Sequence, residues 1–511
     1  QAAMQPGFVA MENAPVAAAS LATGRSRWHI PPQVIGSSCN TDPTTWAAAG
    51  RRTLLGVVSG SAAAAMVATR HARRRHHGHG MAARASNAAR EVADAWFRGQ
   101  AELASESAPR KFGAALAERG LTALQEIAAP ARHQEPFRYT DLDALLYNLP
   151  APAAAQVAKE DMLGSLQEML EENDEVLRLV FLDGVLCSEL SRLSPVEDGA
   201  TFVGAIDALS APGIENMSAR VTTLLEKLPE MDMFMAPQKD TLGCAKLAAL
   251  NQAAFQDVAC IFLRKEETVT GQEETVEVAF FSSGACSSSP RLLVDVGENR
   301  KVKVIETHVS LDESDASLSN GICRVVAAEG SHVEHELLQQ KAADARWVES
   351  VTAEVAAGAS YKLRAVQSGG RAARLNAAIA LEGESSSCEM TGCMMADQKQ
   401  QLDVHSLIHH SVPSCRSAQQ QKNMVGGSAE CIFKGSIKVD AEAQQTESSQ
   451  IMRSLLLSKK AQIKAMPSLQ IQADDVSCSH GAALTQLDPD QVFYMASRGL
   501  DGKDARRLML A

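Results

Sequence analysis

The sequence predicts a mainly β protein with a β-solenoid core, flanked by an N-terminal helical region and a short C-terminal helical region. Over residues 238–487, short runs rich in β-branched residues alternate in polarity and are separated by Gly, Ser, Asn or Asp. Long amphipathic helices are nearly absent between them, which argues against a doubly wound α/β sheet. A sandwich, a barrel and a β-helix all remain open. We favour a solenoid because the strands recur over too long a span for one sandwich.

Residues 1–85 have the composition of a targeting leader that is largely disordered, because they are rich in Ala, Ser and Arg and almost free of acid. Within them, Thr53–Thr69 gives 17 uncharged residues between two arginines. This segment is short and weakly hydrophobic for a membrane span. We therefore expect a cleaved leader and no stable membrane anchor, with the metal-binding composition of HARRRHHGHG belonging to the discarded part.

Residues 86–237 are predicted to form an N-terminal helical region. Apolar residues recur at three- and four-residue steps in EVADAWFRGQAEL, KFGAALAERGLTALQEI and EDMLGSLQEMLEEN. PFRYTDLDALL is punctuated by prolines and indicates a turn that leads into a short helix. VLRLVFLDGVL indicates two short strands around a hairpin turn at Asp183-Gly184.

Residues 238–487 supply the strands of the core, and residues 488–511 return to a helical pattern. The strand runs include TVEVAFFSS, RLLVDVG, KVKVIETHVSL, CIFKGSIKV and AQIKAMPSLQIQADDV. Asp488 and Pro489 predict a helix N-cap and first position, and Gly499 predicts its end. Asp501 caps a second predicted helix. These helices suit docking to a partner, although they could equally cap the solenoid.

Composition and motifs exclude several classes of function. The net charge is −12, and because the leader is basic, the remaining body is strongly acidic and lacks the electrostatic footprint of a nucleic-acid-binding protein. No GxxxxGK[ST] or GxGxxG loop is present, so the chain should not hydrolyse ATP. The 11 cysteines are scattered, and we expect most to be buried hydrophobes in a reducing compartment.

The stretch DDVSCSHGAALTQLD contains the strongest candidate site, Cys478 and His480. If Val476 to His480 is a strand, both side chains point to the same face. Thiolate and imidazole suit iron and iron–sulfur clusters, but two ligands do not complete a site. We therefore expect a partner to complete it. The alternative is a structural role, with Cys478 filling the core and His480 hydrogen-bonded at an interface.

Other candidate residues favour structural roles. Asp474 and Asp475 are adjacent, so on a strand they face opposite ways and fit a turn better than a catalytic pair. The neighbouring histidines of DVHSLIHH likewise diverge, so only one of them could face a site. In HVEHE, the residue types of a metal site occur without HExxH spacing, and we expect a solvated helix start; they are His332, His335 and Glu336.

Several ordered blocks resemble the SufB/SufD family of the SUF iron–sulfur cluster assembly machinery. They are FKGSIKV, AQQTESSQ, LLLS, ADDVSCSHGAALTQLD and VFYMASRG, preceded by DVHSLIHH, VPSC and PFRYTDLDALL. CSHGA followed by a helical aromatic motif resembles the SufD branch, and the leader suggests a plastid-targeted form in the stroma. AALTQL and AMPSLQI depart from the usual pattern but do not involve Cys478 or His480.

The resemblance implies a right-handed parallel β-helix within a complex of one SufB, one SufD and two SufC ATPase subunits. It implies that His480, and more weakly Cys478, help to hold a transient cluster shared with SufB, with no cofactor tightly bound to the isolated chain. It also implies SufC docking by the C-terminal helices, where Phe493, Tyr494 and Arg498 are the candidate contacts.

The sequence therefore leaves three alternative functions open. The first is a non-catalytic scaffold subunit of the SufBCD complex. The second is a β-helix carbohydrate-active enzyme using Asp474 and Asp475, although aromatics, which such enzymes use to line a sugar groove, make up only 4% of the residues. The third is an autonomous iron or cluster carrier, which requires four thiols to converge: Cys388, Cys393, Cys415 and Cys478.

Overall fold

The computed structural model describes most of the chain after the predicted leader. The described residues are 91–100, 102–103, 114–147, 149, 160–170, 176–194, 201–205, 220, 224, 242–264, 273–284 and 286–510. The predicted leader and its uncharged segment at 53–69 lie outside them. Across the described part of the chain, no helix combines the length and apolar character needed to cross a membrane.

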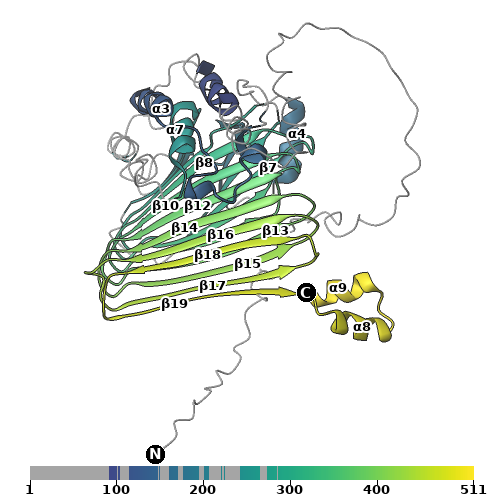
Figure 1. Cartoon of the computed structure of the whole chain (residues 1–511). Helices are drawn as coiled ribbons and strands as arrows, with labels where there is room; N and C mark the ends of the chain where they lie inside the picture. The colour runs from purple at the N-terminus through teal and green to yellow at the C-terminus, as the bar shows by residue number, and fades with distance from the viewer. Residues whose placement is uncertain are drawn as a thin grey trace, which may run out of the picture.

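Two long sheets face each other and dominate the described structure (Figure 1). One sheet holds the odd-numbered strands β5 (Glu273–Ser282), β7 (Lys301–Ser310), β9 (His332–Gln340), β11 (Ser360–Gln367), β13 (Ser387–Ala396), β15 (Arg416–Val425), β17 (Thr446–Leu456) and β19 (Val476–Gln486). The other holds β4 (Ala259–Leu263), β6 (Arg291–Val296), β8 (Leu318–Ala327), β10 (Arg346–Val355), β12 (Ala372–Leu381), β14 (Gln401–His410), β16 (Glu430–Val439) and β18 (Gln462–Ile471). Along the chain, the strands alternate between the sheets.

This alternation makes a parallel β-solenoid of about eight turns, which confirms the predicted fold class. Each strand pairs in parallel with the strand one coil earlier, as Ser360 pairs with His332 and Ser387 with Ser360. Residues that pair between adjacent coils are 26 to 33 residues apart in sequence, as Arg346 is from Ala372 and Ala259 from Leu292. The coil length therefore varies, which explains why no strict sequence repeat is visible. Right-handed winding stays a prediction.

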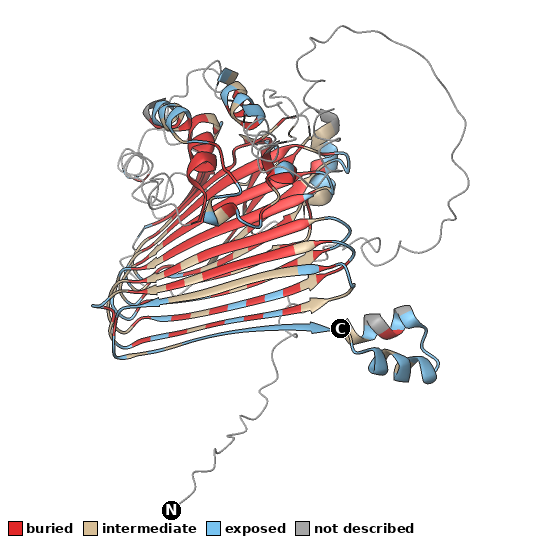
Figure 2. Cartoon of the chain, in the orientation of Figure 1, coloured by how far each residue is buried: buried red, intermediate tan, exposed pale blue. Residues whose placement is uncertain are grey.

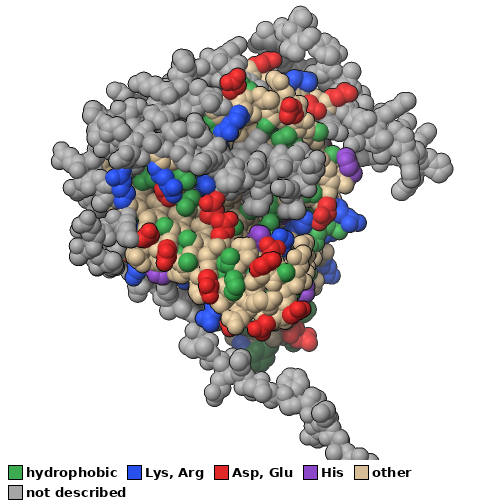
Figure 3. Space-filling model, turned by 90° about the vertical axis from the view of Figure 1, so that its left-hand side faces the viewer, with side chains coloured by type: hydrophobic (Ala, Val, Ile, Leu, Met, Phe, Trp, Pro, Cys, Tyr) green, Lys and Arg blue, Asp and Glu red, His purple; other side chains and the backbone are tan. Residues whose placement is uncertain are grey.

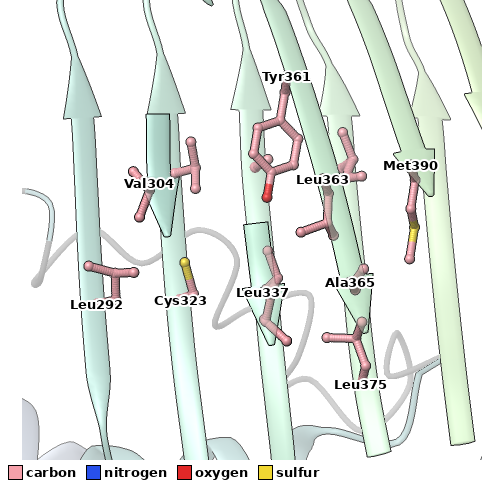
Figure 4. Packing of buried hydrophobic residues seen from close by; sticks show 14 of the residues in the cluster. Leu292, Val304, Cys323, Leu337, Tyr361, Leu363, Ala365, Leu375 and Met390 are labelled. Carbon is pink, nitrogen blue, oxygen red and sulfur yellow. The ribbon is translucent and has the colours of Figure 1, made fainter. Parts of the chain in front are cut away.

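The core lies between the two sheets and is closed by side chains from both. In β11 the burial alternates strictly, with Tyr361, Leu363 and Ala365 buried and their neighbours partly exposed. Figure 4 shows such residues from several strands pointing toward one another in the interior. A buried Val, Leu or Ile contributes about 1.5–3 kcal/mol. Stacked coils therefore share one continuous apolar core, and the burial fades toward the last coil (Figure 2).

Three strands that precede residue 238 join these sheets. β1 (Leu177–Leu182) pairs in parallel with β5 and antiparallel with β2 (Val185–Leu186), and β3 (Thr201–Ala205) pairs with β4. Asp183 and Gly184 both have positive φ, 50° and 86°. That conformation suits a tight primed turn, so the predicted hairpin is confirmed. The proposed domain limits after residues 85, 237 and 487 stay predictions.

Helices cover the N-terminal end of the solenoid (Figure 1). They are a helical segment at 91–100, α3 (Ala114–Glu126), the short turns η3 (Glu135–Phe137) and η4 (Asp143–Tyr147), α4 (Glu160–Met169) and α7 (Ala245–Ala254). Their apolar residues form a second core with the sheet, in which Phe97 and Leu145 pack with Val348 of β10. The predicted turn and short helix in PFRYTDLDALL are confirmed by η3 and η4.

Arg374 on β12 ties the PFRYTDL segment to the solenoid. It is fully buried, and its guanidinium donates hydrogen bonds to the Pro136 carbonyl at 3.1 Å and to Thr140 Oγ1 at 3.0 Å. It also pairs with Asp403 Oδ2 of β14 at 3.1 Å, and it lies 4.8 Å from the centre of the Phe137 ring. One buried charge pair therefore holds the N-terminal segment against two coils.

Replacing Asp403 with Asn should destabilise the fold by about 3–5 kcal/mol at pH 7, because the Arg374 charge then stays buried without its partner. Burial alone would raise the pKa of Asp403, but the charges of His405 and Arg374 outweigh it and hold that pKa below its usual value. Ionised Asp403 therefore stabilises the fold above the unfolded pKa of about 3.9, and this contribution is lost as the pH falls through the folded value.

Urea unfolding of the wild type and of Asp403→Asn at a series of pH values from 7 downward checks this prediction. The stability difference should shrink as the pH falls below about 4. Asp474→Asn, at an exposed bend, should follow the wild type throughout. A difference between wild type and Asp403→Asn that is the same at every pH would contradict the assigned ion pair.

The C-terminal helices stand beyond the end of β19 and leave the last coil uncovered (Figure 1). α8 (Pro489–Ser497) begins at Asp488, whose side chain accepts a hydrogen bond from the backbone N–H of Asp490, and Gly499 follows it at φ +93°. α9 (Gly502–Leu510) follows Asp501, whose carboxylate accepts a bond from Asp504 N–H. The predicted caps are confirmed, and the two helices contact each other.

The visible surface mixes both signs of charge. Figure 3 shows the face that lies on the left of Figure 1, where Asp and Glu side chains are scattered among Lys and Arg. On the described surface in that view, no continuous basic stripe is present. This distribution accords with the net charge of −12.

Candidate functional site

The last coil of the solenoid presents an open end. β18 and β19 are the terminal strands of their sheets, each paired on one edge only. Every described residue of β19 is exposed or half-buried (Figure 2). A long strand with a free edge and an uncovered inner face is a ready template for pairing with another chain. The open end is therefore the first place to look for a functional surface.

Cys478 and His480 both project from β19 on the inner side of the coil. In the register with β17, Cys478 pairs with Ser448 and His480 with Gln450, and both of these β17 residues are buried. Since neighbours in a parallel sheet share a face, the two β19 side chains extend inward-facing columns that end at the opening. The prediction that they share one face is confirmed, because Val476–Gln486 is a strand.

The layer beneath them is polar and hydrogen-bonded. Gln450 Nε2 donates to Gln419 Oε1 at 2.7 Å, and Gln419 Nε2 donates to Ser406 Oγ at 2.7 Å. Beside them the hydroxyls of Ser417 and Ser448 are 2.7 Å apart. A Cβ at Gly435 would overlap the Gln450 amide, so glycine leaves the room that this side chain occupies. This network fixes the floor on which His480 and Cys478 lie.

The rim of the opening is apolar. Leu484 on β19 shares the inner face of Cys478 and His480 and is 50% exposed, and Ile471 on β18 is 40% exposed. Ile463 and Leu469 of β18 are only partly buried against the cores beneath them. Exposed apolar side chains around a few polar ones are typical of a protein interface.

Two donor side chains do not make a complete metal site here. Burial raises the pKa of the Cys478 thiol above its usual value. Neither Cys478 nor His480 belongs to any group of three potential ligands within the described residues. A thiol and an imidazole at an open edge can therefore hold an iron or cluster atom only if another chain adds ligands.

The other carboxylates and histidines that the sequence offered as candidate site residues have structural roles. Asp474 and Asp475 lie in the bend between β18 and β19, where the Asp475 N–H donates to Gln444 Oε1 at 2.9 Å. The interpretation of this pair as a turn device is confirmed. His409 and His410 diverge on β14 as predicted, since His410 is buried and bonds Ser417 while His409 faces out toward Asp440.

The predicted helix start in HVEHE is wrong, because these residues belong to β9. His332 is exposed, Glu336 faces out and pairs with Lys303, and His335 is buried inside the solenoid. Burial over this strand alternates at every residue. That period of two, with Val333 and Leu337 inside, was the available signal for a strand, and the polar residue types obscured it.

The four thiols of the carrier hypothesis are not brought together. Cys388 and Cys393 are both on β13 but an odd number of residues apart, so they face opposite sides of the sheet. Cys415 lies in a turn and contacts Ser386 Oγ at 3.3 Å. Most described cysteines are buried, as predicted, and burial raises the pKa of Cys388 to about 12.

Phe493, Tyr494 and Arg498 lie on the outer surface of α8. Phe493 is 74% exposed and Tyr494 59% exposed, whereas Val492 and Met495 are the half-buried residues of that helix. Arg498 donates a hydrogen bond to the Tyr494 hydroxyl at 3.0 Å, and its guanidinium lies 5.1 Å from the centre of that ring. An aromatic residue paired with an arginine beside an exposed Phe is typical of an interaction hot spot.

Several known proteins are similar in sequence to this chain. The family described as "SUF system FeS cluster assembly, SufBD core domain" matches residues 280–511. The chloroplastic protein ABCI7 of Arabidopsis thaliana is 29% identical over 388 residues, which cover 75% of this chain and 77% of that protein. The iron–sulfur cluster assembly protein SufD of Escherichia coli is 24% identical over 397 residues, covering 77% of this chain and 86% of that protein.

Residues 280–511 of this chain form a SufBD core domain. An iron–sulfur cluster assembly SufBD family protein of Synechocystis is also similar, at 26% identity over 394 residues, 76% of this chain and 83% of that protein. The resemblance stated from the sequence is thus confirmed. The matched region 280–511 contains the open coil and both C-terminal helices, so the candidate site lies within the part that defines the SufBD core.

Proposed function

We propose that this protein is the SufD-type, non-catalytic scaffold subunit of a SufBCD complex for iron–sulfur cluster assembly. The observation that carries the proposal is the uncovered last coil, which presents Cys478 and His480 beside an apolar rim. Two ligands at a free strand edge need a second chain for a complete cluster site. SufB is the partner in this proposal, and the cluster is transient and shared between the two chains.

Pairing through the open end accounts for several features at once. A partner strand on the free edge of β19 would satisfy its unpaired backbone groups. A partner side chain over Leu484 and Ile471 would bury the exposed apolar rim. The same docking would enclose His480 between the two chains. A protein that only needed its own stability would cover such an edge with a helix or loop, whereas α8 and α9 stand aside.

SufC binding is assigned to the C-terminal helices in this proposal. Phe493→Ala should weaken SufC binding by about 2 kcal/mol or more, because an exposed aromatic anchor is lost from the centre of the contact. Gln491→Ala, at an exposed position of the same helix, is the matched control and should bind as the wild type does. Isothermal titration of each variant with SufC measures the change. Equal affinity for wild type and Phe493→Ala would remove this residue from the contact.

The function itself is tested by reconstitution. SufB and SufC are incubated with iron, a sulfide source and ATP, with or without this chain, and cluster transfer to an apo-ferredoxin is followed by absorbance. We expect transfer to rise when the chain is added, while the isolated chain hydrolyses no ATP. Transfer that is independent of the chain would contradict the scaffold role. The chloroplast stroma is the proposed location, since the Arabidopsis relative is named chloroplastic.

A further inference from the structure

A second group of chemically active side chains lies deep inside the solenoid, far along the coils from His480. Glu306 and His308 project inward from β7, His335 from β9, and Glu349 from β10 of the facing sheet. Each of these four residues is at most 1% exposed. Nothing in the sequence motifs of the open end involves them, and they come from coils much nearer the N-terminus.

The potential ligand atoms of this group converge. Glu306 Oε1 lies 2.8 Å from His308 Nε2, and Glu306 Oε2 lies 2.9 Å from His335 Nε2. Across the core, Glu349 Oε2 lies 3.6 Å from His308 Nε2. Glu306, His308 and Glu349 each place one ligand atom within 4.8 Å of the other two. In a tetrahedral site with bonds of about 2.0–2.1 Å, neighbouring ligand atoms are about 3.3 Å apart, so small adjustments suffice.

Residues around this group leave room for Glu349 and pack against His308. A Cβ at Gly321, the β8 partner of Glu349 in the sheet register, would overlap the Glu349 carboxylate, so glycine keeps that space free. Phe280 stacks on the His308 ring with centroids 5.1 Å apart, and Trp347 meets its edge at 5.5 Å. These two rings pack against the imidazole, which is fully buried.

Three polar atoms of this pocket are buried without a hydrogen-bond partner among the described residues: Glu349 Oε2, His308 Nδ1 and Trp347 Nε1. Of these, Glu349 Oε2 points at His308. An unsatisfied buried carboxyl oxygen costs about 1–3 kcal/mol. By contrast, both oxygens of Glu306 are engaged, and His335 is oriented through its other nitrogen by the Tyr361 hydroxyl at 3.0 Å. The Tyr361 hydroxyl orients the His335 ring, and His335 in turn holds the Glu306 carboxylate. Metal-binding carboxylates are commonly oriented by such neighbours.

We propose that the interior of the solenoid binds one divalent transition metal ion, Zn²⁺ or Fe²⁺, through Glu306, His308 and Glu349, with His335 positioning Glu306. Two carboxylates and one imidazole are ligands that both ions accept. A divalent cation would neutralise the two buried carboxylates. It would also satisfy the orphaned Glu349 oxygen. This proposal is independent of the SufBCD assignment, because it concerns other residues and needs no partner.

The test measures metal retained by the full-length chain after expression with added Zn²⁺ and gel filtration. His76, His77 and His79 are replaced by Gln in every sample, since this run could bind metal by itself. The parent should retain one Zn²⁺ per chain and show nitrogen and oxygen ligands at about 2.0–2.1 Å by X-ray absorption. Glu349→Gln keeps the shape of the side chain but removes its charge. It should lower the affinity for Zn²⁺ about 10- to 100-fold or more.

Glu354→Gln is the matched control, because it removes a partly exposed carboxylate from the outer face of the same strand. It should retain Zn²⁺ as the parent does, and added Zn²⁺ should raise the melting temperature of both but not of Glu349→Gln. Circular dichroism confirms that each variant is folded. Equal Zn²⁺ in the parent and Glu349→Gln, or a sulfur-rich ligand shell, would overturn the proposal. A parallel anaerobic series with Fe²⁺ shows which of the two ions is held more tightly.

Discussion

His480→Ala is expected to lower cluster transfer to an acceptor protein by about 10-fold or more in the reconstituted complex, while the chain stays folded and assembled. The imidazole projects from β19 into the open end, so its loss leaves no void in the core beneath it. Its expected contribution is one ligand to a cluster that SufB completes. Removing one ligand from an incomplete set weakens the site without affecting the β-sheet pairing.

The transfer rate is measured with purified SufB and SufC and an apo-ferredoxin, and assembly is checked by gel filtration. His332→Ala is the matched control, because His332 is also exposed on a strand of the same sheet but on its outer face. It should transfer clusters at the wild-type rate. A wild-type transfer rate for His480→Ala would contradict the role assigned to this histidine. Loss of assembly would instead show that His480 is an interface residue.

Leu484→Asp is expected to weaken the pairing with SufB by about 2 kcal/mol or more, which is at least 30-fold in affinity. Leu484 lies on the inner face of β19 and is half exposed at the apolar rim. If SufB covers this rim, a carboxylate there would be buried without a partner charge. Because the residue is exposed in the isolated chain, the stability of the fold itself should change little.

The next residue along the strand supplies the control. Ala483 pairs with the exposed Arg453 and faces outward, so Ala483→Asp adds the same charge on the opposite face of β19. Surface plasmon resonance with immobilised SufB compares the three chains. Equal affinity for Leu484→Asp and wild type would show that SufB docks elsewhere, and equal losses for both variants would point to general repulsion of negative charge.

Local patterns in the sequence were enough to predict the shared face of Cys478 and His480 and the caps of the C-terminal helices, but not that the last coil is uncovered. Alternation in VSCSHG places Cys478 and His480 on one face whatever the rest of the fold does, and that face is inward. Asp488 and Pro489 fix the start of α8, because the Asp488 side chain caps the helix and Pro489 occupies its first position. Such features depend on neighbours in the chain, which is why they could be derived from the sequence before the structure.

The interior cluster could not be derived in the same way. His335 and Glu306 are 29 residues apart, and they meet only because one coil stacks on another in a particular register. Glu349 reaches them from the facing sheet, so its contact depends on how the two sheets pack. Likewise, Arg374 and Thr140 are 234 residues apart and meet only when the PFRYTDL segment docks. Because the coil length varies, a search for a fixed sequence repeat would not find these pairings.

The measurement that tests the central claim most directly is native mass spectrometry of this chain co-expressed with the SufB and SufC of the same organism. The account predicts one assembly with one copy of this chain, one SufB and two SufC, which loses SufB when the chain carries Leu484→Asp and loses SufC when it carries Phe493→Ala. A chain that is recovered alone, or only with a second copy of itself, would contradict the scaffold function.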